Sequence, residues 1–170
     1  KGKKQWVKWS TEVIPSLLQP YLRLLRVTDS LRNLHHNEEL ECTCGHTQLR
    51  KLTVTCLFFD ALKEQSISIC QCSTAPQVLL ARGFFACSPV APSLAVDIKL
   101  LEFARLQFLH LVPNTTGWCD AMESFLNGLL FKLTTRNVLR RRFSNCLRWY
   151  YTLLDSTEVY VQDSLNSVRQ

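Results

Sequence analysis

Cysteine is the residue type through which this chain is best equipped to do chemistry. The chain of 170 residues has eight cysteines, and four of them form two pairs separated by one residue, Cys42 with Cys44 and Cys70 with Cys72. In an extended chain, residues i and i+2 point to the same face, and a small bend brings two such sulfurs to the ~3.8 Å separation of neighbouring ligands on zinc. The four thiolates therefore predict one closed zinc site of structural rather than catalytic type.

Other roles for the cysteines stay open at this point. The paired cysteines have two alternative interpretations, as buried reduced thiols or as disulfides, although a disulfide within Cys-x-Cys would close a strained ring. One Zn²⁺ per chain is expected. Two are the alternative, because six thiolates would suffice for two zinc ions. Cys119 and Cys146 fall in helical patterns and are predicted to be core thiols. The candidate additional ligands are Cys87, Cys56 and His46, with a place in the core favoured for Cys56.

A run of arginines is the second candidate binding feature. Its members are Arg136, Arg140, Arg141, Arg142 and Arg148, and a helix is predicted around them. At about 100° per residue, Arg141 and Arg148 share the face opposite the apolar stripe of that helix. Such an exposed face can contact the phosphates of a nucleic acid, and the alternative is an ordinary solvated helix surface.

Nothing in the sequence is typical of an active site. Asp60, Asp97 and Glu102 fit turn and helix-surface positions better than paired acid–base catalysis. No Gly-rich phosphate loop and no Ser/His/Asp arrangement stands out. The pair His35-His36 is interpreted as a polar turn. We therefore expect this segment to be no enzyme and to have no small-molecule substrate.

The composition is that of an ordinary globular domain. Hydrophobic residues make up 46% of the chain and charged residues 20%, which is too apolar for a disordered chain. The net charge of +6 permits contact with nucleic acid and does not demand it. No apolar run approaches the ~18 residues of a membrane span, so no membrane association is expected. Because the first residue is Lys1, we expect a piece of a longer protein, and no targeting signal is visible.

The elements that must position these residues change in character along the chain. Alternating apolar residues predict two strands over 52–59 and 66–70, joined by a hairpin connection over 60–65. Two short strands form a weak unit that needs additional support. Asn114 opens a glycosylation-type sequon that we interpret as a helix-capping loop. Helices are predicted from Pro20, from a cap at Ser93 to before Pro113, from a cap at Thr116 to Gly128, and from Thr134 or Thr135 onwards.

These elements predict a mainly α protein with a small zinc-clipped β-hairpin, which is an α+β fold. Helices would flank the metal-binding hairpin within one compact unit. We divide the chain into an N-terminal helical flank (1–40), a Cys-x-Cys zinc-binding cluster (41–92), a helical segment packed on it (93–155), and a tail or linker (156–170).

The order of these motifs resembles a known cysteine cluster. The motifs are Cys42-Thr43-Cys44-Gly45, Thr55-Cys56-Leu57-Phe58-Phe59-Asp60, Cys70-Gln71-Cys72, Leu79-Leu80-Ala81-Arg82-Gly83-Phe84-Phe85-Ala86-Cys87 and Ala91-Pro92-Ser93-Leu94-Ala95-Val96-Asp97. Over roughly residues 6–150, the chain resembles the Cys-x-Cys cluster of the first type associated with KDZ (Kyakuja–Dileera–Zisupton) transposases. The family type often has Phe-Pro-Cys where this chain has Phe85-Ala86-Cys87.

The resemblance implies a biological setting that spacing alone does not. It implies a zinc-chelating accessory module of a basidiomycete DNA transposon, N-terminal to the transposase domain, in a nuclear protein. The implied metal ligands are Cys42, Cys44, Cys70 and Cys72. The implied partners are transposon DNA and the remainder of the transposase chain, whose catalytic core would lie outside this segment. The alternative is a degenerate transposon-derived remnant, or a protein–protein interaction module without DNA binding.

Overall fold

A nearly continuous helical run opens the structure, which is a computed structural model and describes residues 2–37, 39–40, 44–45, 49–133 and 138–170. The run consists of α1 (Gly2–Lys8), a π-helical turn (Trp9–Val13) and α2 (Ile14–Val27). The prediction that a helix begins at Pro20 is wrong, because Pro20 lies inside α2. Proline removes a helical hydrogen bond to the carbonyl four residues earlier, and the side chain of Gln77 donates to that carbonyl, Ser16 O, at 3.4 Å.

The predicted hairpin is present and forms half of a four-stranded sheet, but its connection is shorter than predicted: it spans 58–61, and residues 62–65 belong to the second strand. β1 (Arg50–Leu57) pairs antiparallel with β2 (Leu62–Ile69), from Arg50 opposite Ile69 to Leu57 opposite Leu62. The strand order is β2-β1-β4-β3, where β3 is Phe84–Ala86 and β4 is Leu94–Asp97. β4 runs parallel to β1 and antiparallel to β3. The α+β class is thus confirmed, and the hairpin obtains its additional support from β4.

The prediction that Ser93 caps a helix is wrong, because the short strand β4 lies between Ser93 and the helix that follows. The three residues that follow Ser93 are all buried, as in a central strand covered on both faces, and such a short apolar run does not distinguish a strand from a helix. α4 (Ile98–His110) begins instead after Asp97, whose carboxylate accepts a hydrogen bond from the Lys99 backbone N–H at 3.0 Å. Asp97 is therefore the N-cap of the helix.

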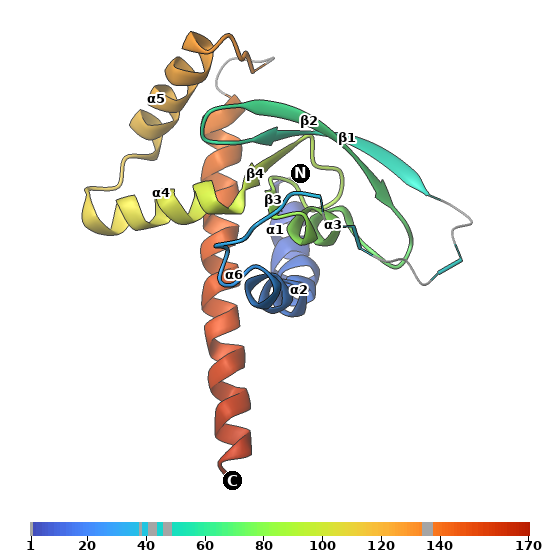
Figure 1. Cartoon of the computed structure of the whole chain (residues 1–170). Helices are drawn as coiled ribbons and strands as arrows, with labels where there is room; N and C mark the ends of the chain where they lie inside the picture. The colour runs from blue at the N-terminus through green and yellow to red at the C-terminus, as the bar shows by residue number, and fades with distance from the viewer. Residues whose placement is uncertain (1, 38, 41–43, 46–48, 134–137) are drawn as a thin grey trace.

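Three further helices complete the chain (Figure 1): α3 (Ala75–Ala81), α5 (Thr115–Gly128) and α6 (Val138–Val168). α5 ends at Gly128 as predicted, but the predicted cap at Thr116 is wrong: the N-cap is Asn114, whose side chain accepts a hydrogen bond from Gly117 N–H at 2.9 Å. α6 runs behind the sheet, and its C-terminal end projects away from the other elements (Figure 1). The segment expected as a tail or linker, 156–170, continues α6 as far as Val168.

The core forms where α6 packs against β3 and β4, and where the N-terminal helical run packs against α6 and α3. Trp9 is stacked between Phe85 of β3, at a ring-centroid distance of 5.7 Å, and Trp149 of α6, at 5.5 Å. The predicted apolar stripe of α6 is buried at Phe143, Tyr150 and their neighbours. Cys56, Cys119 and Cys146 are buried, in keeping with a place in the core.

Candidate metal centre

The second Cys-x-Cys pair lies in a tight turn between β2 and α3. Cys70 follows the last residue of β2 and bridges to Ser73, whose N–H donates to Cys70 O at 3.4 Å. The next residue, Thr74, starts α3 with a capping box, in which its backbone N–H donates to Gln77 Oε1 at 2.9 Å. A strand end on one side and a capped helix on the other thus hold the two cysteines in place.

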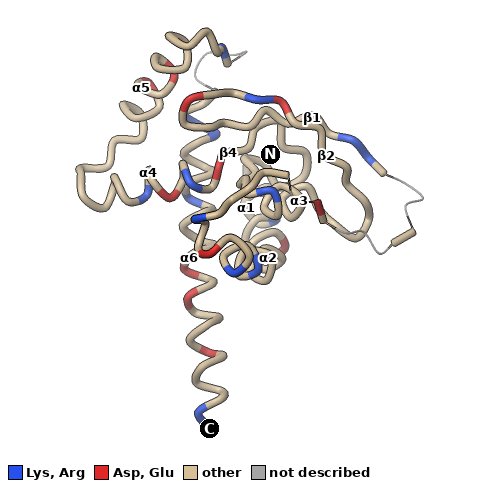
Figure 2. Tube along the Cα trace, in the orientation of Figure 1, with Lys and Arg blue, Asp and Glu red and all other residues tan. Residues whose placement is uncertain are grey.

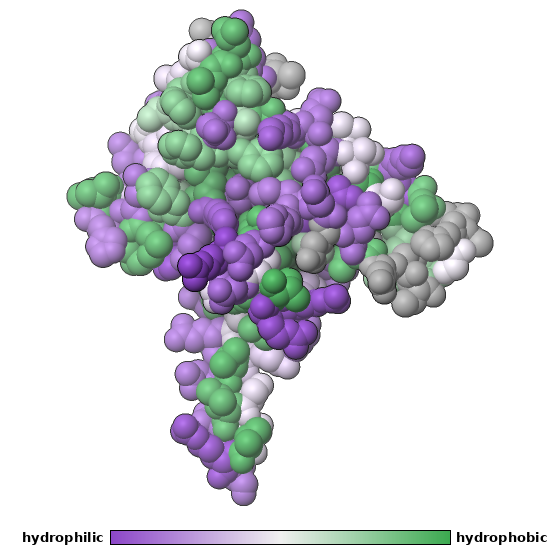
Figure 3. Space-filling model, in the orientation of Figure 1, coloured by the Kyte–Doolittle hydropathy of each residue, from purple (hydrophilic) through white to green (hydrophobic). Residues whose placement is uncertain are grey.

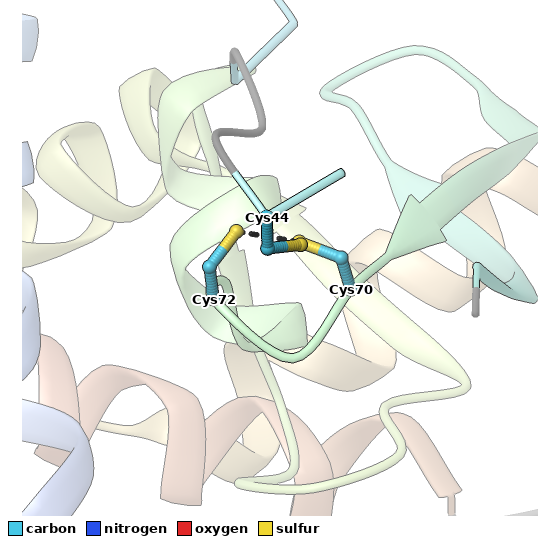
Figure 4. Close-up of side chains that lie close together, drawn as sticks. All are labelled: Cys44, Cys70 and Cys72. Atoms are coloured by element: carbon cyan, nitrogen blue, oxygen red, sulfur yellow. Dashed lines mark hydrogen bonds between the residues drawn. The ribbon is translucent and has the colours of Figure 1, made fainter. Parts of the chain in front are cut away.

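Cys44 brings a third sulfur to this turn. The Sγ atoms of Cys44, Cys70 and Cys72 all lie within 4.8 Å of one another, and Figure 4 shows the three side chains pointing toward a common point. The sulfurs of Cys70 and Cys72 are 2.7 Å apart, which is longer than the ~2.05 Å of a disulfide. Gly45 follows with φ +74°, in the left-handed region that glycine adopts at low cost, so the chain turns sharply beside the sulfurs.

The donor set fits a soft or borderline metal ion. Thiolates select Zn²⁺, Cu⁺ and iron–sulfur clusters over Mg²⁺ or Ca²⁺. Cys44 and Cys72 are exposed and Cys70 is half-buried, so an ion can enter from solvent. Two other predicted ligands, Cys42 and His46, lie outside the described residues. The cysteine cluster of Cys44, Cys70 and Cys72 can therefore hold a metal ion, and a fourth ligand would close the tetrahedron.

The remaining candidate ligands lie elsewhere. Among the described residues, the group of mutually close sulfurs includes neither Cys56 nor Cys87. Burial raises the pKa of Cys56 to about 12, and a thiol that stays protonated is a poor metal ligand. Cys87 is half-buried, and burial also raises the pKa of the nearby Cys146, whose thiol donates to the Phe85 carbonyl oxygen at 3.7 Å.

The arginines of the second candidate feature lie on the first turns of α6. Arg140, Arg141 and Arg148 are exposed, and Arg142 is half-buried with its guanidinium donating to Ser93 Oγ at 2.9 Å. Figure 2 shows the basic residues on this half of α6 and acidic residues further along it. Arg136 lies outside the described residues.

The structure also contains polar contacts between distant residues that the sequence did not indicate. His36 lies in a turn, as predicted, and is half-buried: its ring stacks on Phe84 at 4.4 Å, and its Nδ1 lies 2.8 Å from the Arg82 carbonyl oxygen. Its Nε2 lies 3.7 Å from the carboxylate of Asp97. Burial raises the pKa of Asp97, and the Lys99 N–H and His36 oppose that rise.

Glu102 lies on α4 but is half-buried, so it makes contacts beyond those expected of the helix-surface residue that was predicted. Its carboxylate accepts a hydrogen bond from Tyr150 Oη at 2.7 Å and pairs with both nitrogens of the Arg105 guanidinium edge. The hydrogen bonds from Arg105 lower the pKa of Glu102, partly against the effect of burial. The i,i+3 spacing of Glu102 and Arg105 could have indicated the ion pair from the sequence. No sequence pattern indicates the hydrogen bond between Glu102 and Tyr150 of α6.

Comparison with known proteins places this geometry in a family. Along the part of the chain that the structure describes, no helix has the length and apolarity to cross a membrane. No curated protein and no solved structure matches the chain. A family model described as the CxC1-like cysteine cluster associated with KDZ transposases matches residues 28–128, more than half of the chain and the whole of the described cysteine cluster. The chain therefore belongs to the CxC1-like cysteine cluster family associated with KDZ transposases.

Proposed function

We propose that the chain is a non-catalytic, zinc-chelating module that acts N-terminal to a KDZ-type DNA transposase. The observation that carries the proposal is the approach of Cys44 to Cys70 and Cys72, which come from a different part of the chain. Cys42 is the fourth ligand in this proposal, because it completes the first Cys-x-Cys pair. Four thiolates leave no open coordination position, so the zinc has a structural role.

The position of the cysteine cluster explains what the metal would stabilise. Arg50 and Ile69 form the last pair at the open end of the hairpin, and Cys70 follows directly. Cys44 precedes β1, so a shared ion joins the two strands at the end where no turn connects them. A cross-link at this end lowers the entropy cost of pairing β1 with β2.

Contact with transposon DNA is the first role that we propose for the stabilised module in the nucleus. The chain carries a net charge of +6, and Arg140, Arg141 and Arg148 are exposed along one helix. Guanidinium groups in such an array bind phosphates and release counterions from the duplex.

Transposase assembly is the second role, and a different surface supports it. Exposed hydrophobic side chains gather over α4 and α5, as the space-filling view shows (Figure 3). They include Phe103, Leu109, Leu111, Val112, Phe125, Leu129 and Leu130. Apolar surface of this extent is common at protein–protein contacts. If only this apolar surface binds a partner, the chain is a protein interaction module without DNA binding. If neither this surface nor the arginines of α6 bind a partner, the chain is a degenerate transposon-derived remnant.

Metal analysis of protein purified under reducing conditions tests the core of the proposal. We expect one zinc ion per chain by elemental analysis, because the paired cysteines supply four thiolates. Protein without zinc would contradict the site. Two ions per chain would instead give Cys56 and Cys87 a role as ligands.

A further inference from the structure

A polar cavity at the start of α6 lies outside the cysteine cluster. Its volume is about 540 Å³, within the ~300–1,000 Å³ range of ligand sites. It is lined by residues of α6, of α1, of the loop between β3 and β4, and by the first residue of β4. The polar side chains on its wall are Gln5, Ser88, Ser93, Arg141, Arg142 and Asn145.

The charge of the cavity is positive. Among the described residues that line it, two carry guanidinium groups and none is Asp or Glu. Neither Arg141 nor Arg142 takes part in an ion pair among the residues that the structure describes. The Arg142 guanidinium is held at the wall by its hydrogen bond to Ser93 Oγ at 2.9 Å, which leaves further N–H donors for a ligand.

We propose that this cavity binds a phosphate group. Arginine donates paired N–H groups that match two phosphate oxygens, and the Asn145 amide and the serine hydroxyls can donate to the others. Donors that converge from three elements suit a tetrahedral oxyanion better than a planar carboxylate. The inference extends the DNA-contact role proposed above, because the phosphate could belong to a DNA backbone or be free in solution.

Binding of inorganic phosphate to the zinc-loaded chain, measured by isothermal titration calorimetry, is the direct test. We expect Arg141→Gln combined with Arg142→Gln to weaken binding at least tenfold. Arg23→Gln combined with Arg26→Gln is the matched control, because these two exposed arginines lie on α2, outside the cavity and outside the arginine run of α6. We expect it to change the affinity less than twofold. An equal loss in both proteins would show diffuse charge attraction and overturn the proposal.

A second pair of variants keeps every arginine in place. Asn145→Asp puts a carboxylate at the cavity wall and should weaken phosphate binding at least tenfold by charge repulsion. Asn166→Asp adds the same charge about 32 Å further along α6, at 1.5 Å per residue, and should leave binding unchanged. Phosphate binding that withstands Asn145→Asp would overturn the proposal.

The same variants distinguish the two sources of phosphate. If the ligand is a DNA backbone, a labelled duplex should bind the parent tightly, lose affinity in the Arg141/Arg142 double variant, and be displaced by inorganic phosphate. If the ligand is free phosphate, the double variant should lose phosphate and bind the duplex as the parent does. Either result supports the cavity. Absence of binding to both probes would overturn it, while an unchanged zinc content would leave the proposed metal module standing.

Discussion

At the residue scale, the cysteines divide into two groups by their surroundings. Cys44 and Cys72 are exposed beside Cys70, where a metal ion has access. Cys56 and Cys119 lie in the core, and burial raises the pKa of each to about 12. At neutral pH the two core thiols remain protonated, and they pack as small hydrophobic groups.

This division predicts opposite outcomes for two single substitutions. Cys70→Ser should release the metal and unfold the hairpin, because structural zinc binding is worth ~10–16 kcal/mol against the ~5–15 kcal/mol stability of a typical domain. Cys146→Ala removes one small core group, so it should cost about 1 kcal/mol and retain the metal. Bound zinc and thermal melting of the two proteins check this. The assignment of ligands is wrong if Cys146→Ala is the variant that loses zinc.

Glu102 gives a second residue-scale prediction, which concerns pH. Because Arg105 lowers its pKa in the folded state, ionised Glu102 stabilises the protein above its unfolded pKa, and this stabilisation is lost as pH falls through the lower folded pKa. Glu102→Gln should therefore cost about 1 kcal/mol at pH 7 and much less near pH 3. Denaturant unfolding of both proteins at the two pH values measures the difference. The exposed residue Glu158 provides the control, and Glu158→Gln should show no such pH dependence.

At the element scale, the two halves of β1 differ in the number of strands with which they pair. Thr55, Cys56 and Leu57 pair with β2 on one side and β4 on the other. Within the described part of the chain, the half from Arg50 to Val54 pairs with β2 alone, and it is the half next to the cysteine cluster. The stability of this half should thus depend on the metal, since a two-stranded ribbon is marginal by itself.

Removal of the metal should therefore loosen the sheet from one end. With a chelator present, hydrogen exchange should become faster in Arg50–Val54 and in the facing part of β2. Exchange in Thr55–Leu57, β4 and the buried part of α6 should change little, because these segments pack in the core. Hydrogen-exchange mass spectrometry with and without chelator provides the measurement. A uniform increase across all four strands would instead indicate that the metal supports the whole fold.

At the scale of the whole molecule, charge and apolar surface lie on different parts. The exposed arginines occupy the first turns of α6, whereas exposed hydrophobic residues cover α4 and α5 (Figures 2 and 3). This separation allows a nucleic acid and a protein partner to bind without competing for one surface.

The salt dependence of DNA binding tests the role of the arginines on α6. Changing Arg140, Arg141, Arg142 and Arg148 together to Gln should weaken binding to unrelated duplexes by about the same factor. The slope of log affinity against log salt should become shallower by roughly 0.9 for each phosphate that the variant no longer neutralises. Fluorescence anisotropy over a salt series provides both quantities. An unchanged affinity and slope would show that these arginines are only a solvated surface.

The sequence by itself determined the local features. Alternation of apolar residues located the hairpin, because side chains on a strand alternate between two faces. The Cys-x-Cys spacing identified Cys70 and Cys72 as a pair, because two residues are enough to place both sulfurs on one side of the chain. The α+β class and the family followed from the order of such motifs.

Only the tertiary structure decided the features that depend on distant segments. Leu94–Asp97 is a strand because β1 offers it a parallel edge, and its short apolar run is equally compatible with a helix. Glu102 accepts a hydrogen bond from Tyr150, and the ring of His36 stacks on Phe84. No local sequence pattern connects either pair. Local periodicity reports the neighbours of a residue along the chain, whereas these positions depend on groups that meet only after folding.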